Sequence, residues 1–170
     1  MRYNRHYKKL LREIATNTPL EVVKDPEPLI VIAMTGWTTV SKQALRSAMS
    51  LSREIKVVHV AEGGKPDEFC DHWIEYVQQP ATAAGFAVPE LVVLKSPYRF
   101  VIAPMVNYVR TLARKNPDRR VVAIVPELVE KRRYYYFLHT QRATLLETQL
   151  LMEGNDRISV LNIPWYLKSG

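Results

Sequence analysis

Short apolar segments alternate with longer segments of helical periodicity along most of this chain. The apolar segments are Leu29–Met34, Lys56–Ala61, Glu90–Lys95, Arg120–Val125 and Arg157–Asn162. Strands that alternate with helix-length segments are typical of βαβ units, whose strands form a parallel sheet with helices on both faces. The pattern therefore predicts an α/β fold with a five-stranded parallel, doubly wound sheet.

The first 28 residues follow a different pattern. Residues 2–15 place apolar side chains at helical spacing among basic ones, which predicts a short amphipathic helix. Three prolines in the segment Thr16–Pro28 prevent that helix from continuing. We therefore expect residues 1–28 to form a basic helical arm with a linker, and residues 29–170 to form the α/β domain.

Amphipathic helices are expected between the strands. A long one is predicted from about Tyr134 to Met152, before the fifth strand. Trp165–Tyr166 follow that strand, where they either cover the sheet edge or contact a second copy of the chain. The helix that begins near Pro66 is expected to bury four side chains, which are Phe69, Trp73, Tyr76 and Val77.

The composition excludes several classes of protein. The net charge of +7 suits phosphate groups, nucleic acid or an anionic membrane surface as partners, although any single basic cluster can also be a solvated helix face. A single cysteine, Cys70, excludes an internal disulfide, and no apolar run reaches the ~20 residues that span a bilayer. The four histidines lie too far apart in the sequence for a zinc motif. Of these, His59 lies within a predicted strand and is expected to be a buried, hydrogen-bonded residue.

Sequence motifs of catalysis are absent. The chain has no GxGxxG dinucleotide fingerprint, no GxxxxGK(S/T) phosphate loop and no GxSxG nucleophile elbow. We therefore expect no catalytic residues, no metal site and no enzymatic activity.

The order of the strands decides where a ligand would bind. In a sheet of order 3-2-1-4-5, the ligand crevice lies beyond the strand C-termini, between the first and fourth strands. Thr35–Gly36 and Pro126–Glu127 are expected to face each other across it. Gly36 either lets a ligand approach closely or only permits a tight turn from strand to helix, and the sequence supports both interpretations equally.

Two further segments offer groups that bind anions. Ser96, Tyr98 and Arg99 precede a predicted helix N-terminus, where free N–H groups and a guanidinium can hold a phosphate. In the alternative, Ser96 caps the helix and Arg99 is solvated. Arg132 and Arg133 precede the last helix and can reach over the crevice, where arginine binds phosphate bidentately. For these two arginines we prefer a ligand or partner over solvent, whereas the aromatic residues after them are expected in the core.

Four segments together resemble a known family. They are Ser96–Pro97–Tyr98–Arg99, Val125–Pro126–Glu127, Leu138–His139–Thr140–Gln141 and Asn162–Ile163–Pro164–Trp165–Tyr166–Leu167. They look like the cytoplasmic C-terminal domain of permeases of the amino-acid–polyamine–organocation superfamily, in the subgroup of KimA-type potassium importers. The resemblance covers roughly residues 29–167. It implies a universal-stress-protein-like fold, also called adenine nucleotide alpha hydrolase-like, with strand order 3-2-1-4-5.

The resemblance also implies that this chain is part of a larger membrane protein. A transmembrane transporter domain would lie N-terminal to it, and the basic helix over residues 2–15 resembles the segment that leaves the last membrane helix. Positive charges beside a membrane exit fit the cytoplasmic side. We therefore expect a cytoplasmic domain at the inner face of the plasma membrane, belonging to a potassium or amino-acid transporter.

The family further implies regulation. We expect a homodimer that senses an adenine nucleotide, with cyclic di-AMP as the regulatory ligand and no other cofactor. ATP is less expected, because the glycine-rich loop of ATP-binding universal stress proteins is missing and Pro126 to Gln141 contain no glycine. The expected ligand-binding residues are Thr35, Gly36, Ser96, Tyr98, Arg99, Arg132, Arg133, His139 and Gln141.

Other interpretations stay open at this point. The chain can instead be a structural dimerisation module without a ligand, or a stand-alone ATP-binding stress protein. The arm over residues 2–15 can bind anionic lipid by itself instead of serving only as a tether. A nucleic acid polymer is not an expected partner.

Overall fold

The computed structural model describes residues 2–62, 68–96, 102–129, 148–150 and 155–166. From Leu29 onward, these residues form a doubly wound α/β domain with one parallel sheet in the order β3-β2-β1-β4-β5, as predicted. The strands are β1 (Leu29–Met34), β2 (Ile55–Glu62), β3 (Glu90–Ser96), β4 (Val121–Val129) and β5 (Ile158–Tyr166). The helices are α1 (Arg2–Ile14), α2 (Thr39–Leu51), α3 (Glu68–Asp71), the π-helix η1 (Ile74–Gln78), α4 (Gln79–Ala83) and α5 (Ile102–Lys115).

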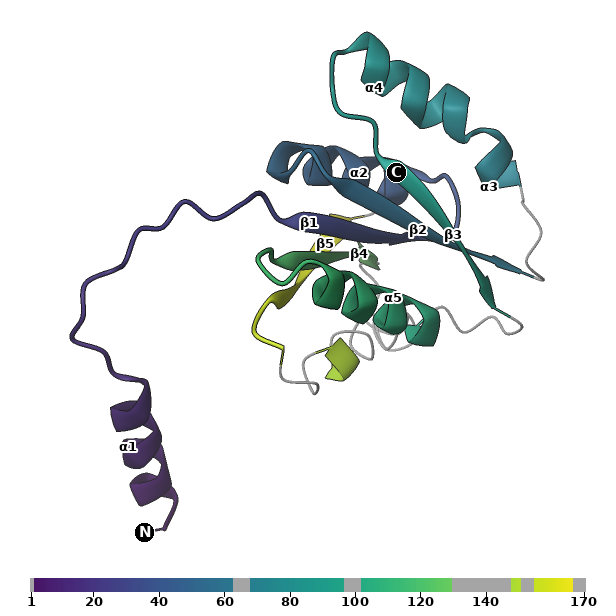
Figure 1. The fold of residues 1–170 in the computed structure, drawn as a ribbon. Helices are drawn as coiled ribbons and strands as arrows, with labels where there is room; N and C mark the ends of the chain where they lie inside the picture. Colours follow the sequence, from purple (N-terminus) through teal and green to yellow (C-terminus); the bar gives the residue numbers. More distant parts are fainter. Residues whose placement is uncertain (1, 63–67, 97–101, 130–147, 151–154, 167–170) are drawn as a thin grey trace.

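The central strand β1 is buried on both faces of the sheet. Successive side chains of a strand point to opposite faces, so Ile30 and Ile32 pack with α2 and α3, whereas Val31 packs with α5. Figure 1 shows the same layers, with α2, α3 and α4 on one side of the sheet and α5 on the other. The unbroken apolar sequence of β1 follows from this two-sided burial.

One row of residues spaced four apart anchors α3, η1 and α4 to the sheet. Phe69, Trp73 and Val77 are buried as predicted, and Ala81 continues their row. Tyr76, by contrast, is 41% exposed, so the prediction that it is buried was wrong. At 3.6 residues per turn such a row would drift by about 40° per step around a regular helix.

The π-helical turn η1 corrects this drift. Its wider turn closes with a bond from the Gln79 N–H to the Ile74 carbonyl, one residue further back than in an α-helix. Pro80 explains its position, because proline has no N–H and its ring clashes with the carbonyl four residues earlier, that of Tyr76. The wider turn relieves that clash and keeps the buried row facing the sheet.

A glycine ends this helical segment. Gly85 has a φ of 73° in the left-handed region, which residues with a Cβ rarely adopt. The N–H groups of Gly85 and Phe86 donate to the carbonyls of Thr82 and Ala81 at 3.0 and 2.9 Å. This is a Schellman cap, and it turns the chain towards β3.

Strands β4 and β5 are longer than the sequence predicted. Pro126 and Glu127 were expected to leave the sheet, but they continue β4, and Trp165–Tyr166 likewise lie within β5. These predictions were wrong because a proline is tolerated where one side of a strand is unpaired. Beyond Ile124 the β1–β4 pairing has ended, and Pro126 pairs only with β5.

Most of the predicted helix from Tyr134 to Met152 lies outside the described residues. Its described part, residues 148–150, is helical, and Leu150 is buried in the cluster on the α5 side of the sheet. Among the residues that the structure describes, no helix is both long and apolar enough to cross a membrane.

The N-terminal helix α1 lies apart from these layers. An extended segment, residues 15–28, joins it to β1, and Figure 1 shows α1 at the far end of that segment. The apolar side chains of Tyr7, Leu10, Leu11 and Ile14 are exposed.

Candidate functional site

The strands flanking β1 extend further than β1 at the C-terminal edge of the sheet. On one side, β1 pairs with β2 as far as Met34 opposite His59, whereas β2 pairs with β3 as far as Glu62 opposite Ser96. At about 3.3 Å per residue, these three further residues extend the β2–β3 pair by about 10 Å beyond β1.

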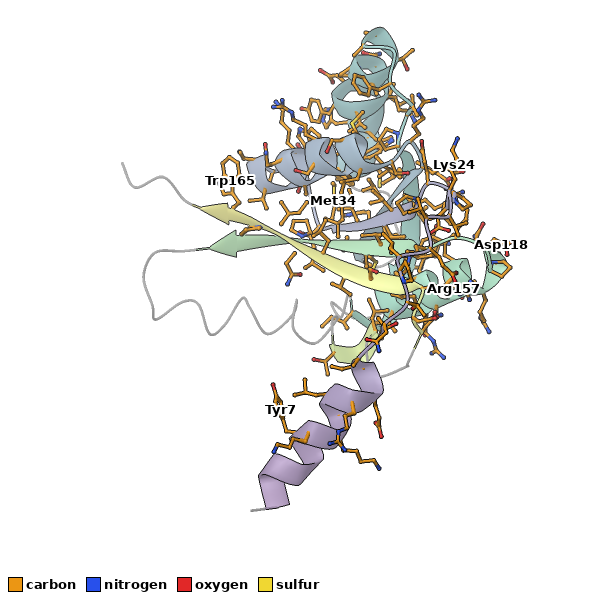
Figure 2. All side chains as sticks on the ribbon, turned by 90° about the vertical axis from the view of Figure 1, so that its left-hand side faces the viewer. Tyr7, Lys24, Met34, Asp118, Arg157 and Trp165 are labelled. Atoms are coloured by element: carbon orange, nitrogen blue, oxygen red, sulfur yellow. The ribbon has the colours of Figure 1, made fainter. Side chains whose placement is uncertain are left out.

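The other side of β1 shows the same relationship. Its pairing with β4 ends at Ile32 opposite Ile124, whereas β4 and β5 remain paired as far as Val129 opposite Tyr166. Figure 2 shows β4 and β5 as two arrows that extend together beyond Met34 to Trp165. We call this C-terminal edge, where β1 ends between two longer strand pairs, the indented edge.

Thr35 and Gly36 follow β1 at the indented edge. Thr35 is exposed and Gly36 is half-buried. A Cβ added to Gly36 would meet no heavy atom within 4 Å, and its φ is not in the left-handed region. The conformation of this turn therefore does not require a glycine, and the space next to the Gly36 Cα is open.

The helix α2 begins directly beyond this turn. Thr38 is its N-cap, and the Thr38 Oγ1 accepts from the Ser41 N–H at 3.1 Å. The Ser41 hydroxyl donates to the Gly36 carbonyl at 2.7 Å. These bonds hold the Thr35–Gly36 turn against the first turn of α2, so the turn has a defined geometry.

A buried histidine fixes the end of β1. The His59 Nδ1 lies 2.9 Å from the Met34 carbonyl oxygen, and the residue is 1% exposed. A carbonyl oxygen only accepts, so Nδ1 carries the proton and donates. The prediction that His59 is a buried, hydrogen-bonded residue is thus confirmed, and its bond holds the residue that precedes Thr35.

The sequence interpretation missed an aromatic stack beside this turn. The ring centroids of Trp37 and Tyr76 are 5.9 Å apart, and those of Tyr76 and His72 are 5.0 Å apart, with nearly parallel planes in both pairs. The stack ties the turn after β1 to Tyr76 in η1 and to His72, which lies between α3 and η1. Two signals could have found it: an aromatic residue directly after Gly36, and the four-residue spacing of His72 and Tyr76 in a helix.

The structure brings together only some of the predicted ligand residues. Thr35 and Gly36 lie at the indented edge, and Ser96 ends β3 at the same edge, with β2 between them. Because neighbouring strands lie about 4.8 Å apart, Ser96 is displaced sideways from β1 by about 10 Å. The remaining predicted residues lie outside the described part of the chain: Tyr98, Arg99, Arg132, Arg133, His139 and Gln141.

The described groups at the indented edge suit binding. They are the exposed Thr35 with its hydroxyl, the half-buried backbone of Gly36 and the start of the capped helix α2. Hydroxyl and backbone groups contact a ligand by hydrogen bonds. In the described ranges, no group of three or more His, Cys, Asp or Glu side chains is placed to hold a metal ion.

Comparisons with known proteins identify the family. The family model described as the KimA potassium transporter C-terminal domain matches residues 24–165. The chain is also 27% identical over 162 residues to the potassium transporter KimA of Bacillus subtilis strain 168. That alignment covers 91% of this chain and 25% of the relative, so the chain spans about a quarter of the relative's length. Because the family match covers most of the chain and all of the sheet except the last residue of β5, this chain belongs to the family of the KimA potassium transporter C-terminal domain.

Proposed function

We propose that this chain is a non-enzymatic, cytoplasmic regulatory domain of a potassium transporter, and that it dimerises and binds cyclic di-AMP at the indented edge. The observation that carries the proposal is the end of β1, with exposed Thr35 and open Gly36 between two longer strand pairs. In doubly wound sheets, the position between strands 1 and 4 is where ligands bind.

The ligand chemistry assigns a role to each group. Thr35, Gly36 and Ser96 contact the base or ribose, because hydroxyl and backbone groups discriminate these by hydrogen bonds. The two phosphates of cyclic di-AMP bind Arg132 and Arg133, with Arg99 as a further cation, since guanidinium groups pair phosphate bidentately. Tyr98, His139 and Gln141 supply additional polar contacts or face the second subunit.

The symmetry of the ligand favours a dimeric site. Cyclic di-AMP has two identical nucleotide halves, and a two-fold symmetric dimer presents the same surface twice. Binding would regulate transport by favouring one arrangement of the two domains, because a ligand shifts an equilibrium only through its different affinity for the two states.

Calorimetric titration of the chain with cyclic di-AMP, ATP and cyclic di-GMP tests this proposal. We expect the tightest binding for cyclic di-AMP, and binding weaker by tenfold or more in Arg132→Ala/Arg133→Ala, since a charge-assisted hydrogen bond contributes about 1.5–3 kcal/mol. Gly36→Val should weaken binding while the domain stays folded, because an added Cβ would meet no heavy atom within 4 Å. Ala87→Val, an exposed position before β3 at the other end of the sheet, is the matched control.

Each other outcome contradicts a named part of the proposal. No heat with any nucleotide at high micromolar concentration would contradict nucleotide binding, and the chain would then be a structural dimerisation module without a ligand. ATP turnover that is lost in Gly36→Val would instead indicate a stand-alone stress protein. A monomer by light scattering, with and without cyclic di-AMP, would exclude the dimer.

A further inference from the structure

We propose that α1 is a docking helix for an anionic lipid surface. Its apolar side chains Tyr7, Leu10, Leu11 and Ile14 lie on one stripe of the helix. In the part of the chain that the structure describes, nothing buries this stripe: all four are exposed, Tyr7 at 60% and Ile14 at 67%. Figure 1 shows α1 apart from the layers of the domain, and Figure 2 shows Tyr7 pointing away from its axis. A stripe of this kind needs an apolar environment from outside the domain.

The charges of α1 identify the kind of environment. Lys8, Lys9 and Arg12 are exposed, and the sequence of the helix adds Arg2 and Arg5. The sequence of the helix thus holds five cations and one acidic residue, Glu13, whose carboxylate lies 3.8 Å from the Lys9 Nζ.

The spacing of two cations disfavours α1 in water alone. Lys8 and Arg12 are four residues apart, so their like charges are neighbours on the helix surface and repel each other. Anionic headgroups remove this repulsion while the stripe enters the boundary between headgroups and acyl chains. Lysine and arginine next to the stripe can keep their charges in the headgroup layer while their methylene chains lie along the apolar region.

A second copy of α1 is the weaker candidate for this stripe. Pairing two such helices would bring their cations together, and these like charges would repel each other. An anionic surface would instead attract the same cations. Charge complementarity therefore favours lipid over self-association. Docking would also limit the position of the domain, because residues 15–28 can span at most about 50 Å when fully extended.

Vesicle sedimentation with the 170-residue chain, in the absence of nucleotide, tests the inference. We expect binding to phosphatidylcholine vesicles that contain about 30% phosphatidylglycerol, little binding to phosphatidylcholine alone, and release as salt rises from about 50 to about 500 mM. Each cation near the surface contributes about fivefold, so Lys8→Gln/Arg12→Gln should weaken binding by about 25-fold. The control Lys42→Gln/Arg46→Gln removes two exposed cations with the same spacing from α2 and should change little.

A second pair of variants, one in α1 and one control in α2, tests the apolar part of the contact. Leu11→Gln should weaken vesicle binding by about tenfold, since it loses the burial of a leucine side chain. Leu51→Gln, at the end of α2, should have little effect although the two leucines are similarly exposed, at 46% and 50%. Circular dichroism would confirm that all variants keep the folded domain.

Three results would overturn the inference. They are equal binding to neutral vesicles, unchanged binding of Lys8→Gln/Arg12→Gln, and unchanged binding of Leu11→Gln. Light scattering tests the alternative that a second copy of α1 covers the stripe. If the chain self-associates, does not bind vesicles, and loses self-association in Leu11→Gln, the stripe is an interface between two copies. None of these results depends on nucleotide binding, so they leave the proposed function untouched.

Discussion

The guanidinium of Arg119 holds the backbone of Glu27 at the N-terminal edge of the sheet. The Arg119 Nε and Nη2 donate to the Glu27 carbonyl oxygen at 2.9 and 2.6 Å, and Nη1 pairs with the Glu54 carboxylate. The Glu27 carboxylate in turn accepts from the Arg53 N–H at 3.1 Å. The end of the linker is therefore fixed to the loops before β2 and β4.

Arg119→Ala should release this end of the linker. We expect the free energy of unfolding to fall by about 1–2 kcal/mol, because the partly buried guanidinium makes several hydrogen bonds at once. Hydrogen exchange should accelerate at the Leu29 amide, the first of β1, more than at Ile32 in its middle. Arg53→Ala is the control, because only its backbone N–H bonds to Glu27. Equal effects of the two substitutions would contradict the role of Arg119.

Loss of the His59 donor should destabilise the end of β1. His59→Leu leaves the buried Met34 carbonyl without this hydrogen bond, at an expected cost of about 1–3 kcal/mol in urea denaturation. His59→Asn keeps a donor near the position of Nδ1 and should recover part of that loss. If the leucine variant were as stable as the unmodified chain, the bond would not hold the end of β1.

Alkaline pH should weaken the contact between β2, β3 and α5. Burial alone lowers the pKa of Lys56, but its hydrogen bond to Glu90 and the charge of Glu90 outweigh burial, so the pKa lies above the ordinary 10.5. Burial raises the pKa of Tyr108 above 10.0. Both groups hold their protons more tightly in the folded state, so their contribution is complete below about pH 10 and is lost as pH rises through the folded values.

Urea midpoints measured between about pH 8 and about pH 11 would show this loss. Tyr108→Phe should reduce the fall in stability at high pH, because the phenol that must stay protonated is gone. Tyr7→Phe, at an exposed position on α1, should leave the pH dependence as it is. A fall in stability that is identical in all three proteins would contradict the assignment to Tyr108.

Truncation in the central strand should be costly. Ile32→Ala removes a fully buried side chain from the cluster between β1, α2 and α3, and we expect a loss of about 2–5 kcal/mol. Leu161→Ala on the edge strand β5 should cost less than half as much, because Leu161 is exposed. Chemical denaturation of both variants measures the difference. Similar costs at the two positions would contradict the two-sided core.

The cap of α2 should affect stability by a smaller amount. Thr38→Ala removes the oxygen that accepts from the Ser41 N–H, and N-caps of this type contribute about 1 kcal/mol. Thr38→Ser keeps the hydroxyl and should stay close to the unmodified chain. Thermal unfolding compares the two, and an equally stable alanine variant would show that the cap does not hold the turn after β1.

The pattern of apolar positions predicted the bounds of some strands correctly and those of others incorrectly. The predicted bounds of β1, Leu29–Met34, are those of the structure, because this strand is buried on both faces and its apolar run marks its length. The runs of β4 and β5 stop before Pro126 and Pro164, but the strands continue. Whether a proline ends a strand depends on which side of the strand lacks a partner, and that is a property of the sheet.

Some features of the candidate site were likewise predictable from the sequence, whereas others were not. The alternation of apolar and polar residues was sufficient for the α/β class, the five strands, the burial of His59 and the place of Thr35 and Gly36 at the end of β1. The early end of β1 between longer neighbours and the outward turn of Tyr76 were visible only in the folded chain. They arise from hydrogen bonds and packing between segments far apart in sequence, and no window of neighbouring residues contains that information.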